Sequence, residues 1–199
     1  MRARAVALGA IVAVSSLGAA CSSPEPASAA SPTESEGSPD PEGGGSALAE
    51  YVTAVCGGVV DWLGEIQTLT QEFQRTSAAA TNIRQVKGAA VAYFGGLLGA
   101  TDTLLSVLED SGIPDVPRGE EAAQHIVDGL GEARTVMENA RERIRDLATD
   151  DPQVFVARLR EITSAMGRQM SSVGASMEEF QAPELDAAAA DVPECEGVS

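Results

Sequence analysis

The stretch that decides the fold is SALAEYVTAVCGGVVDWLGEIQTLTQEFQRT, residues 46–76. Its apolar residues recur at alternating steps of four and three positions, which is the spacing of a long helix that packs one face against other helices. The residues on this face are Leu48, Val52, Val55, Val59, Trp62, Ile66, Leu69 and Phe73. We therefore expect one long amphipathic helix at the start of the domain.

Three further stretches show helical spacing of apolar residues, and polar or proline-containing links separate them. They cover about residues 83–111, 119–147 and 152–182. Thr81 or Asn82 can cap the second helix, and Asp151 followed by Pro152 is a typical start for the fourth. No stretch shows the sustained alternation of a strand. Because short links favour antiparallel neighbours, the sequence predicts an all-α, up-down-up-down four-helix bundle over residues 47–182.

The composition limits the classes of partner. The chain has 199 residues and a net charge of −17, with 13 basic and 30 acidic side chains. Strong acidity argues against binding to nucleic acid and against adhesion to anionic lipid surfaces. We therefore expect no nucleic-acid partner.

The first residues have the pattern of an export signal. Arg2 and Arg4 precede a short apolar stretch, residues 5–17, which is too short to span a bilayer comfortably. The stretch ends in Leu-Gly-Ala-Ala before Cys21. This ending resembles the lipobox of bacterial lipoproteins, although Gly18 stands where that family usually has a branched apolar residue.

The resemblance implies that residues 1–20 are a lipoprotein signal peptide and that Cys21 receives a diacylglycerol anchor. The protein would then lie at the cell membrane, on its extracytoplasmic face. The alternative is a secreted protein that is cleaved at a small residue such as Ala20 or Ala29.

The number of cysteines helps to decide between a lipid-anchored and a secreted protein. Three cysteines would leave an odd thiol in an oxidising compartment. If Cys21 carries lipid, Cys56 and Cys195 remain and can form a disulfide. The chain enters and leaves an up-down bundle at the same end, which places both near each other. The alternative is two free thiols, which are uncommon outside the cytosol.

Composition also divides the chain. Residues 21–46 are rich in Ser, Pro, Glu and Gly and lack apolar periodicity, so we predict a disordered tether. The bundle over residues 47–182 follows. Residues 183–199 form an acidic C-terminal tail that the disulfide ties back to the first helix.

Candidate sites for chemistry are few. The single histidine, His125, leaves no well-supported catalytic triad or zinc site, and we interpret it as a surface residue. Met166, Met170 and Met177 share the core face of the fourth helix, which favours packing over soft-metal binding. The glycine-rich residues 95–99 lack the lysine and the strand of a phosphate loop. The sequence thus predicts no enzyme and no catalytic, cofactor or metal residue.

Glycines interrupt the predicted helices, and each costs about 1 kcal/mol against alanine. They allow either close helix packing or space for a small apolar ligand between the first two helices, beside Gly95 and Gly99.

Basic residues gather at the end of the predicted bundle that lies away from the membrane. We interpret Arg141, Arg143 and Arg145 there as a possible partner surface. The alternative is a solvated surface whose charges follow helix-dipole preferences.

The chain resembles small lipoproteins of high-GC Gram-positive bacteria. The residues that carry the resemblance are the run to Cys21, the Ser/Pro/Glu spacer, Val55-Cys56-Gly57 with Trp62, and Pro193-Glu194-Cys195. We expect a membrane-anchored, non-enzymatic module that binds a partner or another component of the cell envelope. The alternative is a carrier or sensor of a small apolar ligand within the bundle.

Overall fold

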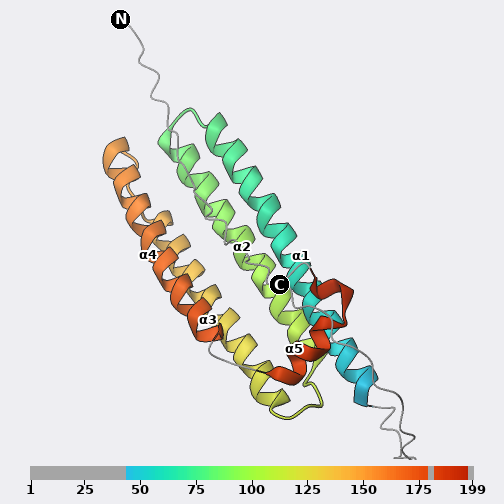
Figure 1. Cartoon of the computed structure of the whole chain (residues 1–199). Helices are drawn as coiled ribbons and strands as arrows, with labels where there is room; N and C mark the ends of the chain where they lie inside the picture. Colours follow the sequence, from blue (N-terminus) through green and yellow to red (C-terminus); the bar gives the residue numbers. More distant parts are fainter. Residues whose placement is uncertain (1–43, 179–181, 197–199) are drawn as a thin grey trace, which may run out of the picture. The chain divides into compact units, whose positions relative to one another are not determined.

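The computed structural model describes residues 44–178 and 182–196 (Figure 1). The chain divides into two units, Met1–Pro39 and Asp40–Ser199, and the described residues belong to the second. Every regular element in them is helical, which confirms the all-α class. The elements are α1 (Gly44–Ala79), α2 (Ile83–Ser111), α3 (Gly119–Arg145), α4 (Pro152–Glu178), α5 (Pro183–Ala190) and the 3₁₀ helix η1 (Pro193–Cys195). The predicted signal peptide, the lipidation of Cys21 and most of the tether lie outside the described residues.

Side-chain caps start two of the long helices where the sequence predicts them. The Asn82 side chain accepts a hydrogen bond from the Gln85 N–H at 3.1 Å, which satisfies a free donor in the first turn of α2. The Asp151 carboxylate accepts from the Gln153 N–H at 2.8 Å and from the Val154 N–H at 3.1 Å at the start of α4. Local polar chemistry therefore sets these two boundaries.

The long helices pack in chain order, α1 on α2, α2 on α3 and α3 on α4 (Figure 1). The apolar face predicted for α1 contributes all eight of its residues to hydrophobic clusters. The largest cluster joins four helices, because side chains of α1 pack against its buried residues from α2, α3 and α4. These buried residues are Ala90, Phe94, Leu97, Leu98, Met137, Ala140, Ile144 and Ile162.

Two glycines allow α1 and α2 to approach closely. A methyl group added at Gly96 would overlap the Leu69 side chain of α1. A methyl group at Gly58 would lie 3.0 Å from Cγ1 of Val107 and 3.1 Å from Cδ1 of Leu104. Close helix packing therefore accounts for both glycines.

Polar contacts connect α2 to both neighbours. The Trp62 Nε1–H donates to Oγ1 of Thr101 at 3.2 Å, across the α1–α2 interface. On the other side, Arg134 of α3 forms salt bridges with Asp102 of α2 and with Glu138. The hydrogen bond to Asp102 is the main cause that raises the pKa of Arg134. By length and composition α2 could cross a membrane, and a core helix of a folded domain passes the same test.

The C-terminal residues contain structure that the sequence analysis did not anticipate. The predicted tail forms α5 and η1, and both pack against α1. Pro183 occupies the first turn of α5, where its missing N–H costs nothing. With eight residues, α5 is too short to be stable alone, so its contacts with α1 stabilise it.

Candidate functional site

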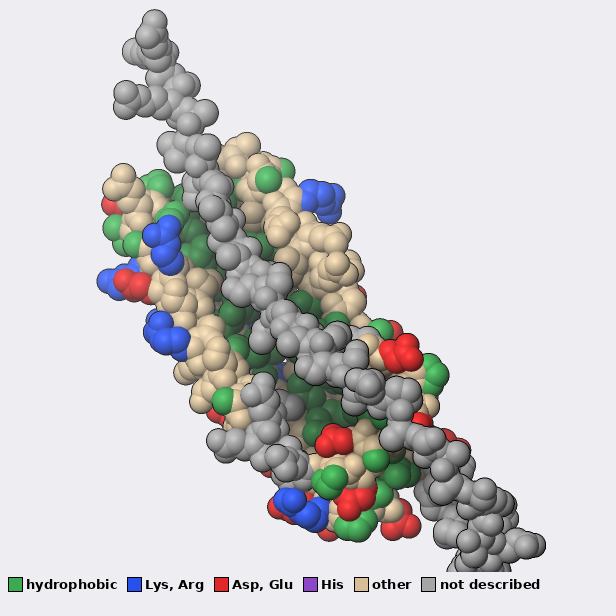
Figure 2. Space-filling model, viewed as in Figure 1, with side chains coloured by type: hydrophobic (Ala, Val, Ile, Leu, Met, Phe, Trp, Pro, Cys, Tyr) green, Lys and Arg blue, Asp and Glu red, His purple; other side chains and the backbone are tan. Residues whose placement is uncertain are grey.

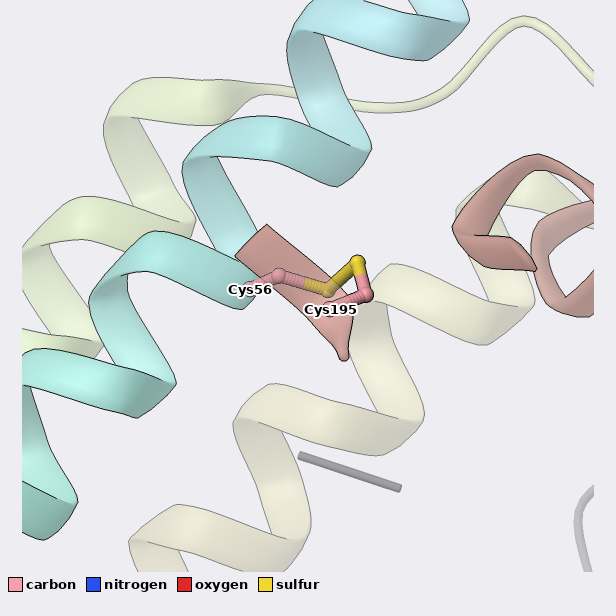
Figure 3. The surroundings of a disulfide bond; sticks show 2 residues. All are labelled: Cys56 and Cys195. Atoms are coloured by element: carbon pink, nitrogen blue, oxygen red, sulfur yellow. A yellow bond between two sulfur atoms is a disulfide. The ribbon is translucent and has the colours of Figure 1, made fainter. Parts of the chain in front are cut away.

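A disulfide joins Cys56 of α1 to Cys195 of η1 (Figure 3). The two Cα atoms lie 5.0 Å apart, within the usual range for a disulfide. This is the pair that the sequence predicts. The bond connects positions 139 residues apart and holds residues 182–196, which we call the C-terminal strap, on the first part of α1.

A small hydrophobic cluster surrounds the disulfide. Tyr51 is 6% exposed and Cys195 is 5% exposed, and Val52 and Val192 are buried beside them. Burial raises the pKa of the Tyr51 hydroxyl above its ordinary value. Tyr51 lies off the repeating apolar face of α1, so its burial could not be predicted from that spacing; residues of the strap pack against it.

The three arginines of the predicted partner surface differ in burial. Arg143 and Arg145 are exposed, but Arg141 is half-buried. The guanidinium of Arg141 lies over Gly95 of α2, about where a methyl group there would meet it at 3.5 Å. Its Nε is buried and has no hydrogen-bond partner among the described residues. Arg141 is therefore less available to a partner than Arg143 and Arg145, because α2 carries a glycine opposite it.

Arg143 instead lines an open cleft of about 290 Å³ between α3 and α4. The apolar side chains of the cleft, Leu147 and Ile162, belong to or pack against the largest core cluster. Charged side chains complete its walls. The full lining is Arg143, Asp146, Leu147, Arg158, Glu161 and Ile162.

Only some of the charged side chains of the cleft form an ion pair with another described residue. Nη1 of Arg158 donates to Oε2 of Glu161 at 2.8 Å. Arg143 and Asp146 have no ion pair or side-chain hydrogen bond with another residue that the structure describes. Among the described residues, the cleft therefore presents one arginine and one aspartate without an ion pair beside apolar side chains.

A second hollow of about 130 Å³ lies where the start of α3 meets the end of α4. Nε2 of His125 lies 3.2 Å from the Ser176 carbonyl oxygen in its wall. The predicted surface histidine therefore connects two helices and is half-buried. Within residues 44–178 and 182–196, no group of three His, Cys, Asp or Glu side chains could hold a metal ion.

Other residues singled out in the sequence fall in the core. Met166 packs against the largest cluster, and Met170 is half-buried. The Met177 side chain lies outside the described part of the structure. Packing thus explains the position of Met166.

Basic side chains gather at one end of the helical domain. The half with the α1–α2 and α3–α4 links holds eight basic and seven acidic side chains, whereas the other described residues hold three basic and seventeen acidic ones. Figure 2 shows blue side chains along α4 and near the end of α1, and red ones toward α5. Five arginines of this basic end have no ion pair with another described residue. These five are Arg84, Arg141, Arg143, Arg145 and Arg160.

Comparisons with protein-family models, curated proteins and solved structures found no match to this chain.

Proposed function

We propose that the protein is an extracytoplasmic lipoprotein, anchored to the cell membrane through lipid on Cys21, and that its helical domain is a non-enzymatic interaction module of the cell envelope. The lipobox-like sequence before Cys21 supports the anchor. The Cys56–Cys195 pair supports an oxidising compartment, because structural disulfides persist there and are rare in the cytosol.

The domain itself is proposed to be an antiparallel, up-down-up-down four-helix bundle, with the strap as an addition. Two contacts support antiparallel neighbours. Lys87 at the start of α2 donates to the Leu147 carbonyl just after α3, at 2.7 Å. His125 near the start of α3 meets Ser176 near the end of α4.

The observation that carries the proposed function is the basic end. Five arginines of this end have no ion pair with another described residue, and the end holds eight basic and seven acidic side chains on a chain with a net charge of −17. Such segregation favours encounter with an acidic partner and rejects basic ones. A bilayer with anionic lipids would repel the rest of the chain, so a protein partner fits better.

The packing of α2 argues against the alternative hypothesis that the protein carries an apolar ligand. That hypothesis needs a gap beside the glycines of α2. Leu69 fills the space at Gly96, and Arg141 covers Gly95. Gly99 is exposed at the surface, and a methyl group added there would meet no side chain of the described residues within 4 Å. These contacts support a packed interior between α1 and α2.

The test is affinity capture of the intact protein from membranes, with captured proteins and lipids identified by mass spectrometry. Changing Arg143 and Arg145 to Glu should abolish capture of the protein partner. Arg168→Glu is the matched control, because it reverses an exposed arginine of α4 outside the basic end. The melting temperature of each variant must be measured, since lost charges at the end of a helix can cost about 1 kcal/mol each. Unchanged capture by the folded double variant would contradict the proposal.

A further inference from the structure

We propose that the Cys56–Cys195 disulfide is a redox-sensitive switch: a thiol reductant opens it, and the C-terminal strap then leaves α1 while the four long helices stay folded. Oxidation returns the strap to α1. This inference goes beyond the proposed function, because it depends neither on the basic end nor on a partner that binds there.

The strap packs on one long helix, α1. Its contacts form a hydrophobic cluster in which Tyr51 and Val52 of α1 are buried against Val192 and Cys195 of the strap. The two clusters that join the long helices to one another contain no described residue of the strap. Departure of the strap therefore leaves the contacts among α1, α2, α3 and α4 in place.

The strap has little intrinsic stability. Neither α5 nor η1 begins with a side-chain cap, and an isolated helix as short as α5 is unstable in water. Val192 and Cys195 are the buried residues of the strap, and α5 has none. Electrostatic attraction between Glu184 and Arg118 adds little, because Arg118 is exposed. Without the covalent bond, these contacts do not offset the conformational entropy that the strap loses on docking.

Thiol–disulfide exchange opens the bond in two steps. Cys56 is half-buried and Cys195 is 5% exposed, so an incoming thiolate reaches Cys56 more readily. The first thiolate attacks Sγ of Cys56, forms a mixed disulfide and expels Sγ of Cys195 as a thiolate. A second thiolate of the reductant attacks the mixed disulfide and expels Sγ of Cys56. Two electrons and two protons thus reach the cysteine pair, and two thiols of the reductant become one disulfide.

Reduction changes the surface of α1. Among the described side chains of this helix, Tyr51 and Val52 are the buried ones, and the strap covers them. Leu48 and Val55 pack against the same cluster. Departure of the strap therefore uncovers an apolar surface on the first turns of α1, so the oxidised and the reduced domain present different surfaces.

The alternative is a structural disulfide whose reduction unfolds the whole domain. The two interpretations differ in what the equilibrium constant for disulfide formation depends on. If reduction releases the strap alone, this constant depends on the contacts of the strap and is independent of the stability of the long helices. If reduction unfolds the domain, a destabilised core lowers the constant as well.

The test measures this equilibrium constant for the full-length protein in glutathione redox buffers, by thiol alkylation and peptide mass spectrometry. Val192→Ala weakens the docking of the strap. Val136→Ala is the matched control, because both valines are 7% exposed and Val136 belongs to α3. We expect Val192→Ala to lower the constant about fivefold or more, and Val136→Ala to change it less than about twofold. Leu185→Ala, a second change within the strap, should act in the same direction as Val192→Ala.

Three outcomes would overturn the proposal. Equal shifts for Val192→Ala and Val136→Ala would mean that reduction unfolds the whole domain. No shift for Val192→Ala and Leu185→Ala would mean that the strap stays docked after reduction. A wild-type pair that remains oxidised wherever stable structural disulfides do would mean that it is no switch. Far-ultraviolet circular dichroism in each buffer checks that the long helices remain folded.

Discussion

Removal of the Cys56–Cys195 disulfide should destabilise the domain and release the C-terminal strap. The relevant change is the pair Cys56→Ser and Cys195→Ser, with reduction of the wild type as an independent route. Because both positions change to the same small polar residue, the variant loses the cross-link with little change in volume.

The magnitude follows from the length of chain that the bond closes. The chain-entropy treatment gives about 5 kcal/mol for a loop of roughly this length, and the two cysteines are 139 positions apart. This figure is an upper limit. The strap packs on α1, so in the reduced protein it can detach while the four long helices stay folded. The detached strap regains chain entropy, which offsets part of the lost stability. We therefore expect the free energy of unfolding to fall by about 2–5 kcal/mol.

The assay is urea denaturation followed by far-ultraviolet circular dichroism. With a slope of about 1.5–2 kcal/mol/M, the expected loss lowers the midpoint by roughly 1–3 M. Hydrogen exchange with mass spectrometry then shows where the native structure changes. Amides of the strap and of the first turns of α1 should lose protection, whereas those of α2 and α3 should keep it.

Two results would refute this reasoning. Equal midpoints for the oxidised wild type and the double serine variant would mean that the bond does not constrain the unfolded chain. Equal loss of protection in the strap, α2 and α3 would mean that the strap is an integral part of the core, so its release would not be local.

Three further predictions follow from single positions. Gly96→Ala should be about 1–3 kcal/mol less stable than Gly99→Ala in urea denaturation, because both gain helix propensity but only the first overlaps Leu69; equal stabilities would contradict the packing. Asn82→Ala should cost about 1 kcal/mol, because it removes the side-chain cap of α2, and a cost near zero would show that the cap is dispensable. Cys21→Ser should shift the protein from the membrane to the soluble fraction or block its processing, and intact mass spectrometry of an unlipidated wild type would contradict the anchor.

The sequence alone was sufficient to predict the four long helices, α1 to α4. Alternating steps of three and four apolar residues identify a buried helical face, because this spacing returns side chains to the same side of an α-helix. Asn82 and Asp151 mark starts because a short polar side chain there satisfies free N–H groups locally. The pairing of Cys56 with Cys195 could also be predicted from the sequence, because the number of cysteines and the expected direction of the helices restrict the possible pairs.

Other features depended on contacts between distant residues. Arg141, Arg143 and Arg145 look alike in the sequence, but Gly95 lies opposite Arg141, and α4 lies beside Arg143. Their different surroundings follow from the way α3 packs between α2 and α4.

The structure of the strap could not be predicted from the sequence either, because it also depends on contacts with distant residues. Residues 183–190 have no apolar periodicity, and an isolated helix of this length is unstable in water. The sequence therefore determined the helices whose stability is encoded in their own spacing and caps. Only the tertiary structure decided α5, the burial of Tyr51 and the cleft between α3 and α4, because their stability and shape come from surfaces that other parts of the chain supply.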